Sequence, residues 1–373
     1  MNYGISLKKL VPISRVAIII LNWNGWKETV ECLESIFQIN YPYYDVILID
    51  NGSKDDSIQM IRTFGEGIKQ VNSEFNISSS DNKPINFSEF SNEELETRND
   101  ILNTFKQSNS QKRLVLIKNE QNYGFAEGNN IGIRFALKYI HPGYILLLNN
   151  DTIVEENFLT ELVLVADAHP DTASVQSLLL RPGGHIIDSL GQELRGMVPW
   201  DRGMGIPINN FEFNDIQEIF GTCAAAALYR AEVFEKVGFF DRDFFLIYED
   251  VDFSWRIRLH GFKALLVTKS IVYHKRGISG GGISKRRMVS EIKWYQSKNL
   301  ILLVIRYIPV SKIVRTIIAW PQKIVVPIFF ILLIGLRKDF LKQFAKEVRE
   351  SLRIRNEIKS NQLLKNIQKK WIK

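Results

Sequence analysis

The sequence predicts a doubly wound α/β fold with a mostly parallel sheet, and two observations support this prediction. Four apolar runs rich in Ile, Val and Leu lack the two-residue alternation of half-exposed strands: Arg15–Leu21, Tyr44–Ile49, Arg113–Ile117 and Tyr144–Leu148. Helical stretches lie between them, at Trp26–Phe37 and Ala126–Tyr139. Strands that are buried on both faces and alternate with helices are typical of a parallel sheet covered on two sides.

Two further segments depart from this pattern. Residues 66–110 are rich in Asn, Ser and Glu and show no clean period, so we expect a surface insertion or partly disordered loop. From residue 284 onward, apolar segments are separated by Lys, Arg and Pro. The longest, Ile324–Leu336, has 13 residues, whereas a membrane-spanning helix needs roughly 20. We therefore expect a re-entrant or interfacial segment, with a basic amphipathic stretch over 339–373.

Charge is distributed unevenly along the 373 residues. The net charge is +7, yet the part from Lys285 to the end holds 21 Lys and Arg against 5 Asp and Glu. Such a basic segment suits a polyanionic surface, either nucleic acid or an anionic membrane leaflet. With two cysteines, Cys32 and Cys223, the chain has no disulfide framework, which favours a reducing compartment. Residues 1–12 do not have the pattern of a secretory signal.

Polar residues end three of the predicted strands. The first run is followed by Asn22-Trp23-Asn24-Gly25, the second by Asp50-Asn51-Gly52-Ser53 and the fourth by Asn149-Asn150-Asp151-Thr152. Ligands of doubly wound sheets bind at the carboxyl ends of the strands. These side chains are therefore candidates for holding a nucleotide or a divalent ion, although Asp50 and Asp151 are equally compatible with ordinary turns.

A second acidic cluster, Glu249-Asp250-Val251-Asp252, follows the aromatic run Phe239–Tyr248. An apolar surrounding raises the pKa of a carboxyl group toward the value that a general base needs, which makes Asp250 a candidate base. Asp252 is four residues before Arg256, and this spacing predicts an ion pair on a helix.

His274 ends the run Ala264–Tyr273, which we expect to be another buried strand. A single histidine is more often structural than a metal ligand. Glycines and cationic residues follow it, at Lys275-Arg276-Gly277 and Gly280-Gly281-Gly282, and predict a loop suited to covering phosphates.

Three other classes of enzyme fit poorly. Asn22–Lys27 supplies one glycine, whereas a dinucleotide-binding turn needs three, and the sequence has no Walker motif. Gly277-Ile278-Ser279-Gly280-Gly281 matches the nucleophile elbow of α/β-hydrolases, in which the catalytic histidine follows the serine. All five histidines precede Ser279, so the hydrolase interpretation fails.

Taken together, the motifs resemble family 2 glycosyltransferases of the GT-A fold, in particular a rhamnosyltransferase-like subgroup. The similarity covers about residues 14–335 apart from 66–110. It is carried by the strand-end motifs given above together with Val16–Asn24, Asn122-Tyr123-Gly124-Phe125-Ala126-Glu127-Gly128-Asn129-Asn130, Phe239-Phe240-Asp241, Tyr248–Asp252 and Val272-Tyr273-His274.

The resemblance implies a role for each group of residues. Asp50 would bind the base or ribose, and the donor pocket would be lined by Asn22, Asn24, Asn51, Gly52, Asn122, Gly124, Asn129, Asn130, Asn149 and Asn150. Asn149-Asn150-Asp151 takes the place of the family's DxD motif, so Asp151 would hold Mg²⁺ or Mn²⁺ with His274 as a further ligand. Asp250, beside Glu249, would deprotonate the acceptor, which Gly221 and Thr222 would border.

We therefore expect a GT-A domain over 14–283 and a membrane-associating region over 284–373. The implied activity is inverting, non-processive transfer of one sugar from dTDP-rhamnose or a UDP-sugar to a lipid-linked saccharide. Assembly of a surface glycan or cell-wall polysaccharide at the cytoplasmic face of the cell membrane fits that activity. The basic segment would then meet anionic lipid, with no nucleic acid involved. A nucleotidyltransferase and a non-catalytic glycan-binding protein of the same fold are the alternatives.

Overall fold

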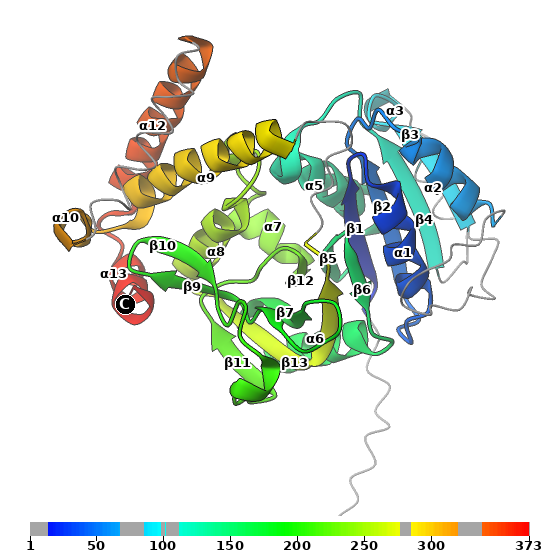
Figure 1. The fold of residues 1–373 in the computed structure, drawn as a ribbon, viewed down its shortest axis with the longest axis horizontal. Helices are drawn as coiled ribbons and strands as arrows, with labels where there is room; N and C mark the ends of the chain where they lie inside the picture. Colours follow the sequence, from blue (N-terminus) through cyan, green and yellow to red (C-terminus); the bar gives the residue numbers. More distant parts are fainter. Residues whose placement is uncertain are drawn as a thin grey trace, which may run out of the picture.

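The computed structural model describes residues 14–67, 86–97, 101, 112–276, 285–319 and 338–372. Within these ranges eleven strands form one mixed sheet (Figure 1). Its order is β11-β13-β7-β12-β5-β1-β2-β4-β3, while β6 pairs with β13 and β8 with β7. The strands are β1 (Val16–Asn22), β2 (Tyr44–Asp50), β3 (Asn86–Ser91), β4 (Lys112–Lys118), β5 (Tyr144–Asn149), β6 (Thr152–Val154), β7 (Thr172–Leu180), β8 (Ile187–Ser189), β11 (Ile216–Ile219), β12 (Ala226–Arg230) and β13 (Lys263–His274).

The four expected central strands are confirmed as β1, β2, β4 and β5. Each is parallel to its neighbour in this group, and β12 then runs antiparallel to both β5 and β7. The expected strand before His274 is confirmed as β13, which is parallel to β7. The sheet is therefore mixed but mostly parallel, as the buried apolar runs predict.

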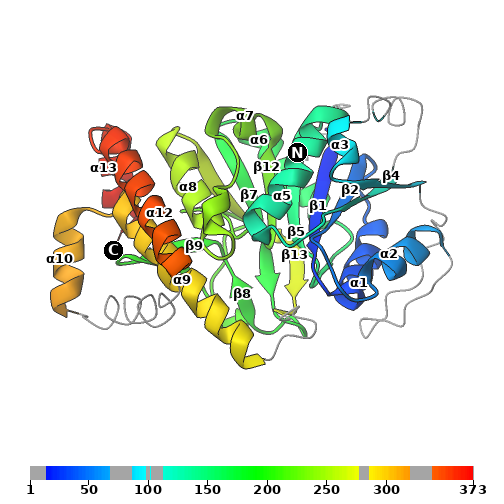
Figure 2. The ribbon, with the colours of Figure 1, turned by 90° about the horizontal axis from the view of Figure 1, so that it is seen from above.

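Helices cover both faces of the sheet (Figure 2). One apolar cluster packs α1 (Trp26–Phe37), α2 (Ser57–Gly65) and α6 (Phe158–Ala168) against the first face. The other cluster packs α5 (Gly124–Phe135), α7 (Ala231–Val237) and α8 (Glu249–Leu259) against the second. The residues of β1 alternate between the two clusters, since Ile18 belongs to the first and Ile19 to the second. This burial on both faces explains the unbroken apolar runs.

The expectation of a surface loop over 66–110 is corrected for residues 86–97. Strand β3 pairs in parallel with β4 at the edge of the sheet, and the short helix α3 (Glu94–Thr97) follows it. Glu89 of β3 forms ion pairs with Arg62, at 2.7 Å, and Lys118, at 2.6 Å. An edge strand gains its hydrogen bonds from the neighbouring strand, so it needs little apolar sequence of its own. Residues 68–85, 98–100 and 102–111 lie outside the described residues.

The C-terminal helices pack against the sheet domain. They are α9 (Lys285–Tyr307), α10 (Val310–Ala319), α12 (Lys338–Ile358) and α13 (Gln362–Trp371). A third apolar cluster joins Trp255 of α8 to Leu302 of α9 and Leu364 of α13. Trp255 also stacks on Tyr307, with ring centroids 4.9 Å apart and planes 5° apart. One face of the basic C-terminal stretch is therefore buried on the fold.

In the part of the chain that the structure describes, no helix combines the length and the apolar character that a membrane crossing requires. The apolar segment Ile324–Leu336, for which we expect a re-entrant or interfacial position, lies outside the described residues.

Candidate active site

The carboxyl ends of β1 and β2 place Asn22 beside Asp50. The two residues are paired in the strand register, and the Asn22 amide Nδ2 donates to Asp50 Oδ2 at 2.8 Å. The other carboxylate oxygen accepts from the backbone N–H of Ser53 at 3.0 Å. Asp50 is buried and shapes the turn that follows its strand. The turn interpretation is thus confirmed for Asp50, and a nucleotide-binding role stays a prediction.

The turns after β1 and β2 are held together by Asn24. Its φ of 51° is left-handed, a conformation that Asn tolerates better than most residues. Its side-chain oxygen accepts from Lys54 N at 2.7 Å, and its own N–H donates to Ser53 Oγ at 2.9 Å. Gly52 packs closely on the segment that leads into α5, because a Cβ at position 52 would lie 2.6 Å from the backbone of Gln121.

Asn51 connects the end of β2 to the start of α5. Its Nδ2 donates to Asn122 Oδ1 at 2.9 Å and to the Gly124 carbonyl at 3.1 Å, while its Oδ1 accepts from Tyr123 N at 3.1 Å. Gly124 has a φ of 81°, and a Cβ at this position would lie 2.5 Å from the ring of Phe245. This turn therefore requires glycine for both its conformation and its close contact.

Two asparagines expected to line the donor pocket make bonds to the protein's own backbone. Asn130 holds Phe240 reciprocally: its Nδ2 donates to the Phe240 carbonyl at 2.9 Å and its Oδ1 accepts from Phe240 N at 3.1 Å. Asn129 donates to the Phe125 carbonyl one turn earlier in α5, at 2.8 Å. Both residues are buried, so they hold the wall of the site in place.

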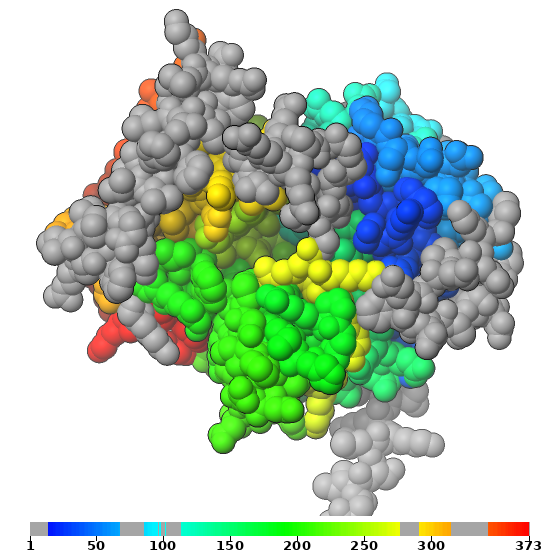
Figure 3. Space-filling model, in the orientation of Figure 1, coloured from blue at the N-terminus to red at the C-terminus, as the bar shows by residue number. Residues whose placement is uncertain are grey.

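Asp151 and His274 are 123 positions apart in the sequence and adjacent in the structure. Strand β6 pairs antiparallel with the end of β13, which sets His274 opposite Thr152. His274 Nε2 then lies 3.2 Å from Asp151 Oδ1 and 3.3 Å from the Asn149 amide nitrogen. Asn150 points elsewhere, donating to Thr29 Oγ1 at 3.0 Å. The end of β13, yellow near the centre of Figure 3, reaches the molecular surface.

Asp188 is a site residue that the sequence did not reveal. It is buried in the middle of β8, and its Oδ2 lies 2.8 Å from His274 Nδ1. Its other oxygen accepts from Arg276 Nε at 2.5 Å, and Arg276 also contacts Asp201 at 2.8 Å. The only signal in the sequence is a lone Asp in an apolar context, which matches no motif.

Opposing effects set the charges of this group. Burial alone would lower the pKa of His274, but Asp151 and Asp188 together raise it to about 9. Burial alone would raise the pKa of Asp188, yet His274 and Arg276 hold it below its ordinary value. Arg276 is thus held beside the carboxylates, and Lys275 pairs with Glu31. The rest of the expected phosphate-covering loop, 277–284, lies outside the described residues.

The chemistry of this donor set fits a divalent ion. A metal-ligating histidine usually donates its second ring nitrogen to a carboxylate, as His274 does to Asp188, which leaves Nε2 facing the oxygen of Asp151. Within the described ranges no group of three or more His, Cys, Asp or Glu side chains is arranged to hold a metal. Asp151 and His274 are the described residues that would hold the ion.

Asp250 lies near the start of α8, where its Oδ2 accepts from Ala224 N at 3.2 Å. Burial raises the pKa of Asp250 to about 6; the Ala224 amide opposes this effect, and the negative charge of Asp201 adds to it. The neighbouring Glu249 is buried, and its Oε2 has no hydrogen-bond partner among the residues that the structure describes. Burial and the charge of Asp250 raise the pKa of Glu249 well above its ordinary value. Asp250 is therefore the carboxylate of the pair suited to accept a proton.

The side chain of Thr222, which we expect beside the acceptor, is fully buried, and its hydroxyl lies 3.1 Å from the Tyr229 hydroxyl and 3.4 Å from Ser174 Oγ. These contacts anchor the loop, and a role of the loop beside the acceptor stays a prediction. Gly221 packs so closely on Ser254 that a Cβ there would lie 2.0 Å from Ser254 Oγ.

Asp252 forms the predicted ion pair with Arg256, with Oδ2 and Nε 2.8 Å apart. Its other oxygen accepts from Arg306 Nη1 at 2.7 Å and from the Tyr307 hydroxyl at 2.8 Å, both on α9. These cations hold the pKa of the Asp252 carboxyl below its ordinary value despite its burial. Its role is structural.

The mixed sheet with one antiparallel strand, β12, inside it and with carboxylates at its polar edge is the GT-A class of fold. A sequence profile of glycosyl transferase family 2 matches residues 17–79 and 96–238. These residues make up more than half of the chain, and the protein therefore belongs to glycosyl transferase family 2.

Individual relatives are distant. The low-salt glycan biosynthesis hexosyltransferase Agl10 of Haloferax volcanii is 25% identical over 142 residues, which are 37% of this chain and 44% of the relative. The match thus spans less than half of that protein. GalNAc-T7, solved with UDP, GalNAc and Mn²⁺, shares the fold with a TM-score of 0.54 and 15% identity over 94% of this chain and 59% of its own. The mannosyltransferase PcManGT of Pyrobaculum calidifontis, solved with GDP-Man and Mn²⁺, aligns at a TM-score of 0.48 and 13% identity over 96% and 86% of the two chains.

Proposed function

We propose that this chain is an inverting, metal-dependent, non-processive glycosyltransferase. It moves one sugar from a nucleotide sugar, dTDP-rhamnose or a UDP-sugar, to a lipid-linked saccharide during assembly of a surface glycan or cell-wall polysaccharide. The observation that carries the proposal is a pair of contrasting carboxylates. Asp151 Oδ1 faces His274 Nε2 at 3.2 Å, and both would hold a metal once this ring nitrogen has lost its proton, whereas Asp250 lies near the start of α8 with a pKa raised to about 6. Carboxylates in such different environments commonly take different catalytic roles.

In this scheme Asp250 accepts the proton of the acceptor hydroxyl as its oxygen attacks the anomeric carbon. The bond from that carbon to the diphosphate breaks, and the nucleoside diphosphate leaves from the opposite face with inversion. Asp151 and His274 would hold Mg²⁺ or Mn²⁺, and the ion would supply positive charge to offset the negative charge of the leaving diphosphate. Arg276 supplies a fixed positive charge next to this position. Glu249, whose pKa is raised, remains protonated and therefore places no second negative charge beside Asp250.

The donor side of the proposal is supported by the turns that carry Asn22, Asp50 and Asn122. Their hydrogen bonds hold a rigid polar wall at the ends of β1 and β2. The relatives point the same way, since GalNAc-T7 was solved with UDP and Mn²⁺ and Agl10 is named a hexosyltransferase of glycan biosynthesis.

A thermal-shift screen tests the donor and the metal together. We expect the melting temperature to rise with a nucleotide sugar plus Mn²⁺ or Mg²⁺, and to rise much less with either component alone, because a bound ion would offset the negative charge of the diphosphate beside Asp151. dTDP-rhamnose and UDP-glucose are the first donors to compare, with the free sugars as controls. Equal shifts with and without metal would contradict the metal-dependent scheme.

We also propose that the C-terminal region attaches the enzyme peripherally to the cytoplasmic face of the cell membrane. Helices α12 and α13 bury Ser351, Leu364 and Ile367 against the fold. Their exposed positions carry a series of cations: Lys342, Lys346, Arg349, Arg353, Lys359, Lys365, Lys369 and Lys370. Each cation near an anionic lipid surface contributes about 1 kcal/mol of attraction.

Co-sedimentation with liposomes tests this attachment. We expect binding to vesicles that contain phosphatidylglycerol and release at high salt, because the attraction is between charges screened by ions. Vesicles of phosphatidylcholine alone are the control. A protein that stays in the supernatant with both kinds of vesicle would rule out the membrane role of this region.

A further inference from the structure

The segment Asp243–Tyr248, which leads into the base-bearing helix α8, has an unusual backbone. Phe245, Ile247 and Tyr248 have φ values of 59°, 70° and 70°. Positive φ is unfavourable for residues other than glycine, and for a β-branched residue such as Ile247 it is a true outlier. Such conformations persist only where the surrounding structure holds them, and they occur often at functional sites.

One side chain of α9 holds this segment. Asn299 is fully buried, and its Nδ2 lies within donor distance of three backbone carbonyls: Phe244 at 2.9 Å, Leu246 at 2.8 Å and Ile247 at 2.7 Å. The preceding residue, Lys298, donates to the Asp243 carbonyl at 2.5 Å and pairs with Glu347 of α12 at 2.9 Å.

The opposite side of the segment is held by α5. The Phe245 carbonyl accepts from Phe125 N at 2.6 Å and from Ala126 N at 3.2 Å. The Phe245 ring stacks on Tyr295, one turn before Asn299 in α9, with centroids 4.9 Å apart. The segment is therefore fixed between the helix that borders the donor wall and the C-terminal helix α9.

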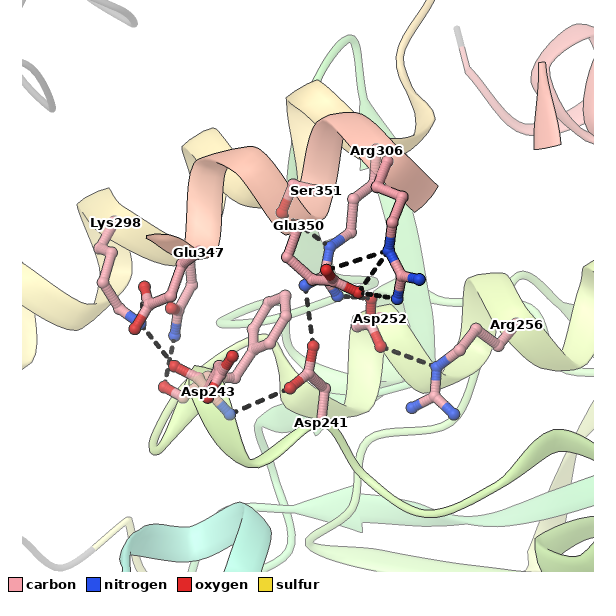
Figure 4. Close-up of polar contacts among 12 residues, drawn as sticks. Asp241, Asp243, Asp252, Arg256, Lys298, Arg306, Glu347, Glu350 and Ser351 are labelled. Carbon is pink, nitrogen blue, oxygen red and sulfur yellow. Dashed lines mark hydrogen bonds and ion pairs between the residues drawn. The ribbon is translucent and has the colours of Figure 1, made fainter. Parts of the chain in front are cut away.

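The same C-terminal helix holds α8 beyond the base. Arg306 contacts Asp252 at 2.7 Å and Asp241 at 2.8 Å, and its Nε donates to Ser351 of α12 at 3.0 Å (Figure 4). Asp241 and Asp252 lie on opposite sides of the strained segment in the sequence. Helix α9 thus holds the polypeptide before, within and after the turn that presents Asp250.

We propose that Asn299 is a positioning residue for Asp250. By holding the carbonyls of Phe244, Leu246 and Ile247, it keeps the left-handed turn formed and the Asp250 carboxylate at the Ala224 amide, facing the reacting centre. The inference rests on the proposed function, in which Asp250 is the base. It makes the C-terminal helix α9 part of what shapes the active site, in addition to any contact of this region with a membrane.

The test is steady-state kinetics on the full-length chain, with release of UDP from UDP-glucose or dTDP from dTDP-rhamnose in the presence of Mn²⁺. We expect Asn299→Ala to lower kcat about 10- to 100-fold, because misplacing a catalytic group by about 1 Å has effects of this size. The KM for the donor should stay within about twofold, because the donor wall does not contact Asn299. Asn299→Ser keeps one hydroxyl donor, so its kcat should fall between those of Asn299→Ala and the wild type.

The matched control is Arg355→Met. Arg355 joins α12 to the end of α9 through the carbonyls of Ile305, at 2.7 Å, and Ile308, at 3.0 Å, away from residues 243–250. We expect this variant to melt at a lower temperature with an unchanged kcat. A wild-type kcat in folded Asn299→Ala would overturn the proposal, as would kcat losses in both variants that simply follow the melting temperature. If Asn299→Ala does not fold, Asn299→Ser decides by the same criteria.

Asp250→Asn separates this proposal from the proposed function. If Asp250→Asn is inactive while Asn299→Ala is normal, only the positioning role fails. If Asp250→Asn turns over at the wild-type rate, the base assignment itself fails.

Discussion

Replacing Asp250 with Asn is expected to lower turnover by a factor of about 10² to 10⁴, the usual contribution of a general base. The substitution keeps the size of the side chain and leaves an oxygen that can accept from the Ala224 amide, so the start of α8 should stay in place. Donor binding should be nearly unchanged, because Asp50 ends β2, His274 ends β13 and Asp151 lies between β5 and β6, whereas Asp250 belongs to α8. Release of nucleoside diphosphate measures turnover, and calorimetric titration with the same donor measures binding.

The pH dependence gives an independent check of the same base. The raised pKa of Asp250, about 6, predicts that kcat/KM rises with pH through about 6 and then levels off, because only the deprotonated carboxylate accepts a proton. Below that value the rate should fall about tenfold per pH unit as the carboxylate is protonated. The residual activity of Asp250→Asn should lack this acidic limb. A flat wild-type profile between about pH 5 and 7 would exclude Asp250 as the base.

Replacing Asp188 with Asn is expected to weaken the binding of Mn²⁺ about 10- to 100-fold, as changes of a ligand's supporting carboxylate typically do. Asp188 fixes His274 from its Nδ1 side, so that Nε2 faces Asp151. Without the negative charge, the ring loses both its orientation and part of its basicity. Calorimetric titration with Mn²⁺ in the presence of UDP measures the change in Kd.

Asp171→Asn is the matched control for this prediction. Asp171 forms an exposed ion pair with Lys263, at 2.6 Å, so the same substitution there removes a charge without touching the site. Its affinity for Mn²⁺ should equal that of the wild type. An unchanged affinity in Asp188→Asn would show that His274 is not oriented by Asp188 for metal binding.

Much of the core of this fold is readable from the sequence, because burial on both faces leaves a local signature. Strands β1, β2, β4 and β5 are buried on both faces of the sheet, so their sequences are apolar along most of their length. Strand β3 escaped notice for the converse reason: its residues are partly exposed at the sheet edge, and pairing with β4 supplies its hydrogen bonds.

Some residues of the candidate site could likewise be predicted from the sequence, and others could not. The Asp252–Arg256 pair follows from helical spacing alone, and Asp50 and Asp151 follow from ending buried strands. Asp188 did not, since its partner His274 is 86 positions away and meets it only through the arrangement of β7, β8 and β13. The burial of the Thr222 side chain was not predictable either, because sequence does not show which side of a loop is buried.

By itself, the sequence determined the alternation of buried strands and helices and the polar residues that end the strands, because both depend on local pattern. The tertiary structure decided which of those residues meet. It brought Asp188 to His274 and placed Asn299 of a C-terminal helix on the strained turn before Asp250. Contacts between residues so far apart in the sequence depend on strand order and helix packing, which no short stretch of sequence encodes.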